Sequence, residues 1–131
     1  MKRTAFAIAL FAVLAVALLL QGCNVEDVDV AGKTYVYTGE TVSGGFGGEF
    51  FTIDINEDGT FEYYEGPLSS YFGIGEWSLT NNVLTLHEQI GDRNASNSFR
   101  VKGGSLIFIE NGSDNFTHVT VKNGERFTCE Q

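Results

Sequence analysis

Residues 69–88 read SSYFGIGEWSLTNNVLTLHE, and this stretch decides the fold class. The run Ser69–Leu79 is rich in aromatic and apolar residues. After the pair Asn81-Asn82, a second alternating run begins at once as VLTLHE. Asparagine is a typical turn residue, so the stretch predicts two antiparallel strands joined by a turn. The alternation places four large apolar residues on the inner face of this pair: Trp77, Leu79, Leu84 and Leu86.

The same pattern continues on both sides, with turn signals at a spacing of about 8–12 residues and no amphipathic helical window after residue 22. Further strands are expected at Lys33–Thr38, at Glu49–Ile55, from Phe61 after the Asp58-Gly59 turn, on both sides of Gly103-Gly104, at Phe116–Val121 and around Phe127, with a loop over 91–97. Such a meander removes its exposed edges by curling up. The sequence therefore predicts an all-β fold, a small antiparallel up-and-down barrel of about eight strands.

Aromatic side chains should fill the interior of this barrel. The candidates for the interior or for a ligand-lining surface are Tyr35, Phe51, Phe61, Tyr63, Trp77 and Phe99. Small barrels either pack their interior with side chains or hold one small ligand. A solid core is the favoured reading, because close packing is the normal state of a domain of this size.

The N-terminal segment has the order of an export signal. Lys2 and Arg3 are followed by an uninterrupted apolar run over residues 5–20. The run ends in Leu20-Gln21-Gly22-Cys23, which resembles the lipobox of bacterial lipoproteins. That resemblance implies cleavage before Cys23 and attachment of a diacylglycerol and a fatty acyl chain such as palmitate to it, which is enough for stable membrane anchoring. An uncleaved signal anchor and a plain secreted protein are the alternatives.

The second cysteine, Cys129, lies two residues from the end of the chain. A Cys23–Cys129 disulfide is possible in an exported protein, but lipidation uses the same sulfur. Cys129 is then expected to be a lone cysteine in a fraying tail, with nothing nearby to hold a catalytic thiol rigid. The expected organisation is a signal peptide at 1–22, a polar tether at 23–31 and one barrel domain at 32–131.

The formal net charge of the whole chain is −9 at pH 7, and loss of Lys2 and Arg3 with the signal makes it more negative by two. A chain this acidic repels nucleic acid and anionic lipid head groups, and it attracts basic proteins, basic peptides and divalent cations. Solubility on a crowded cell surface is the plainer explanation of the charge.

No motif predicts catalysis, a cofactor or a metal site. The series Asn56, Asp58 and Glu62 fails as a calcium loop, because the twelfth position is proline. His87 and His118 are expected on separate strands, away from other ligands. Four glutamates could form a carboxylate pair as in sugar hydrolysis, but only by chance: Glu62, Glu65, Glu76 and Glu88. Glu62 and Glu76 alternate opposite to Phe61 and Trp77 and should face solvent.

A family resemblance rests on GKTYVY, INEDGTFEYYEG, SSYFGIGEWSLTNNVLTL, SLIFIENGSDNF and KNGERF, which span about residues 32–127. These runs resemble the small lipocalin-like modules of Gram-positive bacteria. Such modules occur as lone lipoproteins, and similar ones are appended to sensor-type membrane metallopeptidases. The resemblance implies a lipocalin-like barrel, anchored through the lipid to the outside of the bacterial cell membrane. It transfers no active site.

Two classes of function follow. The first is a lipid-anchored, non-catalytic binding module of the cell envelope, with a small molecule, a glycan or a peptide as its ligand. The alternative is an acidic inhibitor or scavenger of a basic protein or cationic peptide. An apolar cavity would favour the first class, and a continuous acidic patch would favour the second.

Overall fold

The computed structural model describes residues 28–39, 51–66 and 70–131. The signal segment, Cys23 and the first part of the expected strand Glu49–Ile55 lie outside the described residues. No helix within the described ranges has the length and hydrophobicity that crossing a bilayer would require.

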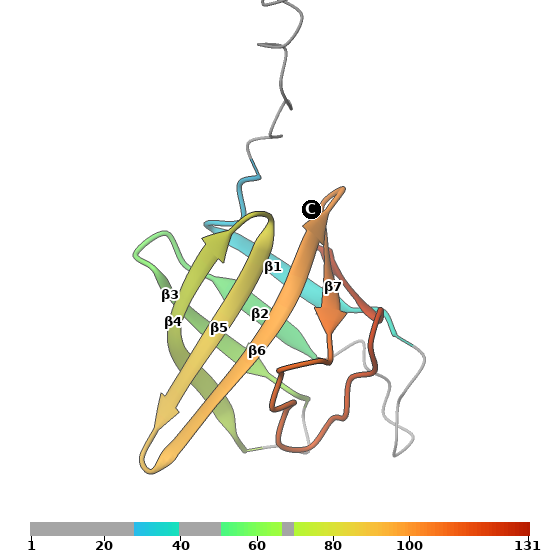
Figure 1. Cartoon of the computed structure of the whole chain (residues 1–131). Helices are drawn as coiled ribbons and strands as arrows, with labels where there is room; N and C mark the ends of the chain where they lie inside the picture. Colours follow the sequence, from blue (N-terminus) through green and yellow to red (C-terminus); the bar gives the residue numbers. More distant parts are fainter. Residues whose placement is uncertain (1–27, 40–50, 67–69) are drawn as a thin grey trace, which may run out of the picture.

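Eight antiparallel strands form one closed barrel in which every strand pairs with its neighbours in the chain (Figure 1). The strands are β1 (Lys33–Tyr37), β2 (Thr52–Ile55), β3 (Thr60–Tyr64), β4 (Phe72–Thr80), β5 (Val83–Ile90), β6 (Arg93–Lys102), β7 (Ser105–Ile109) and β8 (Arg126–Cys129). The last strand returns to pair with the first, with Tyr35 opposite Cys129 and Tyr37 opposite Phe127. The predicted fold, an all-β up-and-down barrel of lipocalin-like type, is confirmed.

The turn between β4 and β5 falls at Asn81-Asn82, where the sequence predicts it. Asn81 and Asn82 have φ angles of 51° and 60°. Two consecutive positive φ angles are the mark of a hairpin turn whose twist matches that of its strands, and asparagine accepts them more readily than most residues. The paired strands are therefore joined in a fixed register, with Leu79 opposite Leu84.

The expected loop over 91–97 is wrong. Only Gly91 and Asp92 form the turn, and β6 begins at Arg93 and runs for ten residues. The inward positions at this end of the strand hold Ala95 and Asn97, both buried. The segment alternates in burial but lacks the large apolar residues that reveal a strand in a sequence.

The expected strand at Phe116–Val121 is also wrong. Residues 110–125 form an irregular segment without a strand. Asn115, at a φ of 71°, accepts hydrogen bonds through Oδ1 from the backbone N–H groups of Phe116 (3.0 Å) and Val121 (2.9 Å). Its side chain thus supplies partners that a neighbouring strand would otherwise provide.

This segment closes one end of the barrel with an aromatic plug. Phe116 is 8% exposed and meets Phe51 edge-on at a ring-centroid distance of 4.8 Å and Tyr63 at 5.0 Å. Phe127 in turn meets Phe51 at 5.0 Å and Tyr37 at 5.1 Å. Tilted and edge-on rings at these distances are favourable, so the interior at this level is packed with side chains.

Both ends of the domain are better anchored than the sequence suggests. Val30, inside the expected tether, is 1% exposed and belongs to the core cluster. Cys129 closes β8, lies opposite Tyr35 and is half-buried, so the expectation of a fraying tail is wrong. The reason is the pairing of β8 with β1, which only closure of the barrel creates.

We expect Phe127→Ala to lower the free energy of unfolding by about 3–5 kcal/mol, the usual cost of removing a fully buried aromatic ring. Phe127 is 0% exposed, and it contacts the rings of Tyr37, Phe51 and Phe99. The matched control is Phe72→Ala, since Phe72 is 57% exposed. Urea denaturation followed by circular dichroism measures both, and a loss below about 1 kcal/mol for Phe127→Ala would contradict this description of the core.

Candidate functional site

The six candidate interior residues do not converge on one cavity. Tyr35, Phe51, Phe61, Tyr63 and Phe99 are all 0–2% exposed. Trp77 is half-buried at the edge of the core, where its indole N–H donates to the backbone carbonyl of Asn56 at 3.0 Å. Only Tyr35 among the six lines the cleft described next.

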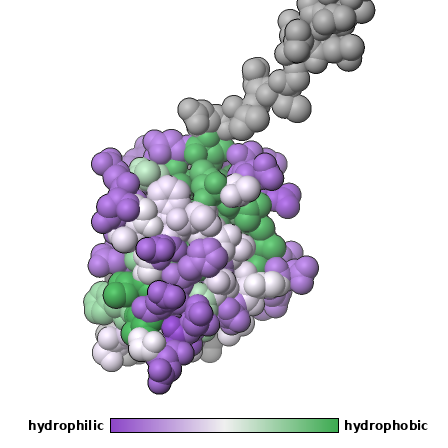
Figure 2. Space-filling model, turned by 60° about the vertical axis from the view of Figure 1, so that its left-hand side comes forward, coloured by the Kyte–Doolittle hydropathy of each residue, from purple (hydrophilic) through white to green (hydrophobic). Residues whose placement is uncertain are grey.

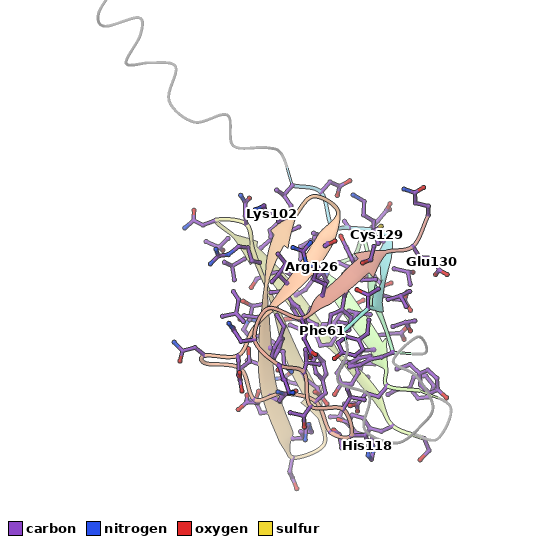
Figure 3. All side chains as sticks on the ribbon, turned by 90° about the vertical axis from the view of Figure 1, so that its right-hand side faces the viewer. Phe61, Lys102, His118, Arg126, Cys129 and Glu130 are labelled. Carbon is purple, nitrogen blue, oxygen red and sulfur yellow. The ribbon has the colours of Figure 1, made fainter. Side chains whose placement is uncertain are left out.

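An open cleft of about 710 Å³ lies at the end of the barrel that holds the start of the described chain and the C-terminus. It is bordered by the segment before β1, the start of β1, the β4–β5 turn, the end of β6, the β6–β7 turn and the end of β8. Figure 3 shows Lys102 and Cys129 at this end and His118 at the opposite one. We call this hollow the terminal cleft.

Positive charge dominates the terminal cleft. Lys33, Arg100 and Lys102 line it against one carboxylate, that of Asp29. The ammonium group of Lys33 donates to the backbone carbonyl of Asp29, not to the carboxylate. Three of the eight basic residues of a strongly acidic chain therefore meet at one hollow.

Tyr35 brings a hydroxyl group to the terminal cleft from within the barrel wall. Its side chain is 1% exposed, and none of the hydrogen bonds found in the described residues engages it. Burial, with smaller contributions from Cys129 and Asp29, raises the pKa of Tyr35 to about 12. The hydroxyl thus keeps its proton at neutral pH and can donate it in a hydrogen bond.

A buried carboxylate organises the opposite end. Glu88 is 1% exposed, accepts hydrogen bonds from the hydroxyls of Tyr63 (2.8 Å) and Tyr71, and pairs with the Nε of Arg93 at 3.2 Å. Burial, followed by the hydrogen bond to Glu88, raises the pKa of Tyr63 far above its ordinary value. The cluster links β3, β5 and β6 through one buried carboxylate, which fits a structural clamp, and the Nε of Arg93 joins it as an ion pair without making a hydrogen bond.

A second buried carboxylate, Glu65, holds the irregular segment in place. Its Oε1 accepts hydrogen bonds from the backbone N–H groups of His118 (2.9 Å) and Val119 (2.8 Å). Its Oε2 is buried without a partner. The four glutamates therefore divide: Glu65 and Glu88 face inward, while Glu62 and Glu76 lie exposed on the outside of the wall, as their alternation predicts.

Sequence reasoning overlooked these two inward glutamates, although a signal was present. Glu88 has the same parity as the inward Leu84 and Leu86, and Glu65 has the same parity as Phe61 and Tyr63. Alternation alone could have placed them inside.

The histidines stay apart. His87 is exposed on β5 and lies 3.1 Å from the hydroxyl of Ser96 through Nδ1, whereas His118 is exposed in the irregular segment and not on the strand expected there. No group of three or more histidine, cysteine, aspartate or glutamate side chains among the described residues could hold a metal ion.

An acidic groove of about 570 Å³ lies outside the wall, beside the β2–β3 turn. Four carboxylates line it together with Lys33: Asp54, Glu57, Asp58 and Glu62. Asp54 stands directly opposite Glu62 across β2 and β3. Like charges placed opposite one another destabilise a sheet, so a cationic group bound here would reduce the repulsion between these carboxylates.

Comparison of the chain with protein-family models, with curated proteins and with solved structures found no match.

Two tyrosines allow a matched prediction about buried hydroxyls. Tyr63→Phe should cost about 1.5–3 kcal/mol of unfolding free energy, because it removes a hydrogen bond to an ion-paired, buried carboxylate. Tyr35→Phe should change stability by less than about 0.5 kcal/mol at neutral pH, because the hydroxyl it removes makes no hydrogen bond within the described chain. Equal losses in the two variants would contradict this assignment.

Tyr35 also makes the free energy of unfolding depend on pH in the alkaline range. Above the ordinary tyrosine pKa of 10.0, the unfolded chain releases a proton that folded Tyr35 retains up to about pH 12. The stability that Tyr35 contributes is thus complete below pH 10 and is lost as the pH rises toward 12. Urea midpoints measured over this range should fall less steeply in Tyr35→Phe than in the unaltered protein.

Proposed function

We propose that the protein is a lipid-anchored, non-catalytic binding module on the outer face of a bacterial cell membrane, and that its ligand site is the terminal cleft. The lipobox-like order ending in Cys23 supports the anchor. The expected occupant is a small molecule, or an exposed group of a glycan or peptide. The resemblance to lipocalin-like lipoprotein modules supports the same class.

One observation carries the choice of site. The barrel interior is filled by aromatic side chains, whereas the terminal cleft is open and combines cations with the hydroxyl group of Tyr35. Binding sites are typically concave with a few convergent polar groups. A ligand of this barrel would therefore be held at its end and not within it.

We expect Cys23→Ser to release the protein from the membrane fraction, because the sulfur that accepts the lipid is lost. Cell fractionation with immunoblotting measures the distribution. Cys129→Ser is the matched control and should leave the protein membrane-bound. If Cys23→Ser also stays with the membrane, residues 5–20 are an uncleaved anchor.

A second candidate function is supported by the acidic groove. Four carboxylates around the β2–β3 turn offer a cationic peptide a surface without a compensating ion pair among the described residues. Association with such a peptide would be steered by the negative charge of the chain and would weaken with salt. This is the role of an acidic inhibitor or scavenger of basic partners.

A nuclear magnetic resonance titration separates the two candidates. We expect ligands from a panel of small anions, sugars and short peptides to shift the backbone amide signals of Asn82, Lys102 and Gly104 in the full-length protein held in neutral detergent micelles. A lysine-rich peptide that instead shifts the signals of Asp54 and Glu62, with weaker binding at high salt, would favour the second candidate. A panel that leaves both sets of signals in place would contradict both functions.

A further inference from the structure

The cations of the terminal cleft are not neutralised by the protein. Among the described residues the single ion pair joins Arg93 to Glu88 at the other end of the barrel, so Lys33, Arg100 and Lys102 have no carboxylate partner there. The backbone carbonyl of Asp29 takes one of the three N–H donors of Lys33 and leaves two. The exposed Lys122 and Arg126, away from the terminal cleft, also have no ion pair, so it is the gathering of three cations around one hollow that indicates a site for an external anion.

The hydroxyl of Tyr35 adds a hydrogen-bond donor to the terminal cleft. Its side chain is 1% exposed and lines the terminal cleft, and the hydroxyl has no hydrogen-bond partner among the described residues. The hydroxyl oxygen is not one of the buried polar atoms that lack a partner, so it reaches the open space of the terminal cleft, where a ligand can meet it. Because its raised pKa keeps the hydroxyl protonated, it offers a donor and thus complements an acceptor oxygen.

The position of the terminal cleft adds a third argument. Val28 lines it, and Val28 is only five positions after Cys23 in the chain. Five residues span at most about 18 Å even when fully extended. If Cys23 carries the lipid, the terminal cleft is held close to the membrane surface. Figure 2 shows hydrophobic surface at this end, and further hydrophobic patches along the right-hand side and at the lower left of the same face.

The net charge of the chain does not oppose such a site. Interactions between exposed charges fade beyond a Debye length of about 8 Å at physiological salt, so a bound anion senses mainly the residues of the terminal cleft. Those residues carry three formal positive charges and one negative charge, although Lys33 also lines the acidic groove with its four carboxylates. Arg100 and Lys102 are exposed on the outer side of β6, while Lys33 and Tyr35 approach from β1.

We propose that the terminal cleft binds a phosphate group, with Lys33, Arg100 and Lys102 supplying the charge and the Tyr35 hydroxyl donating a hydrogen bond. This inference rests on the proposed function and names the chemistry of its ligand. The phosphate can come from the head group of a neighbouring phospholipid or from a soluble phosphorylated compound. Guanidinium and ammonium groups bind phosphate oxygens through charge-assisted hydrogen bonds, which are the strong ones.

The test uses the full-length lipidated protein in two settings. In neutral detergent micelles, inorganic phosphate and glycerol phosphate are titrated while the amide signals of Lys102 and Gly104 are followed. In nanodiscs, the same signals are compared between pure phosphatidylcholine and a mixture with phosphatidylglycerol. Shifts with the soluble probes indicate a soluble ligand, and shifts only with phosphatidylglycerol indicate the lipid head group.

The decisive variants are two pairs with the same change in charge. Arg100→Gln with Lys102→Gln should weaken phosphate binding by about tenfold or more, given the usual contribution of a basic residue near an anionic surface. Lys122→Gln with Arg126→Gln removes one lysine and one arginine from exposed positions that do not line the terminal cleft, and should leave the affinity nearly unchanged. Tyr35→Phe should weaken binding without loss of fold, as its thermal unfolding will show.

Each other outcome counts against the inference. Equal weakening in both pairs would mean a general effect of charge and overturn the site. Absence of binding by phosphate probes, together with binding of a neutral sugar or peptide at the same signals, would overturn the phosphate chemistry and leave the proposed function standing. If no probe of any kind shifts these signals, the proposed function falls as well.

Discussion

The pairing of β8 with β1 is the contact on which the rest of this structure depends. Three residue pairs join the two strands, from Tyr35 opposite Cys129 to Tyr37 opposite Phe127. Without this contact, the meander would be an open sheet with two unpaired edges and one uncovered face. With this contact, the wall closes at eight strands. The interior of a barrel of this size is just wide enough to be filled by side chains.

Closure also determines the difference between the two ends of the barrel. At one end, residues 110–125 must cross the opening between β7 and β8, and they seal it with Phe116. The backbone of this segment is bound by polar side chains, chiefly the half-buried Asn115 and the buried Glu65. At the other end, β1 and β8 meet beside two short hairpin turns, and nothing in the described chain covers the hollow between them.

Electrostatics follow the same division. At the sealed end, the carboxylate of Glu88 binds two tyrosine hydroxyls and Arg93, and Oε1 of Glu65 binds two backbone N–H groups. At the open end, three cations and the Tyr35 hydroxyl border a hollow. Binding sites are typically concave with a few convergent polar groups, so the open end is the proposed site.

The sequence by itself determined the strands that alternate strongly, the hairpin at Asn81-Asn82 and the inward residues from Tyr35 to Phe127, because local periodicity and turn chemistry act between near neighbours in the chain. The sequence misplaced 91–97, where the buried side chains are the small Ala95 and the polar Asn97. It also misplaced 116–121, where the side chains of Asn115 and Glu65 bind the backbone in place of a neighbouring strand. The sequence by itself did not predict the terminal cleft. Lys33, Arg100 and Cys129 lie far apart in the sequence, and only closure of the barrel, which joins the first strand to the last, brings them to one hollow.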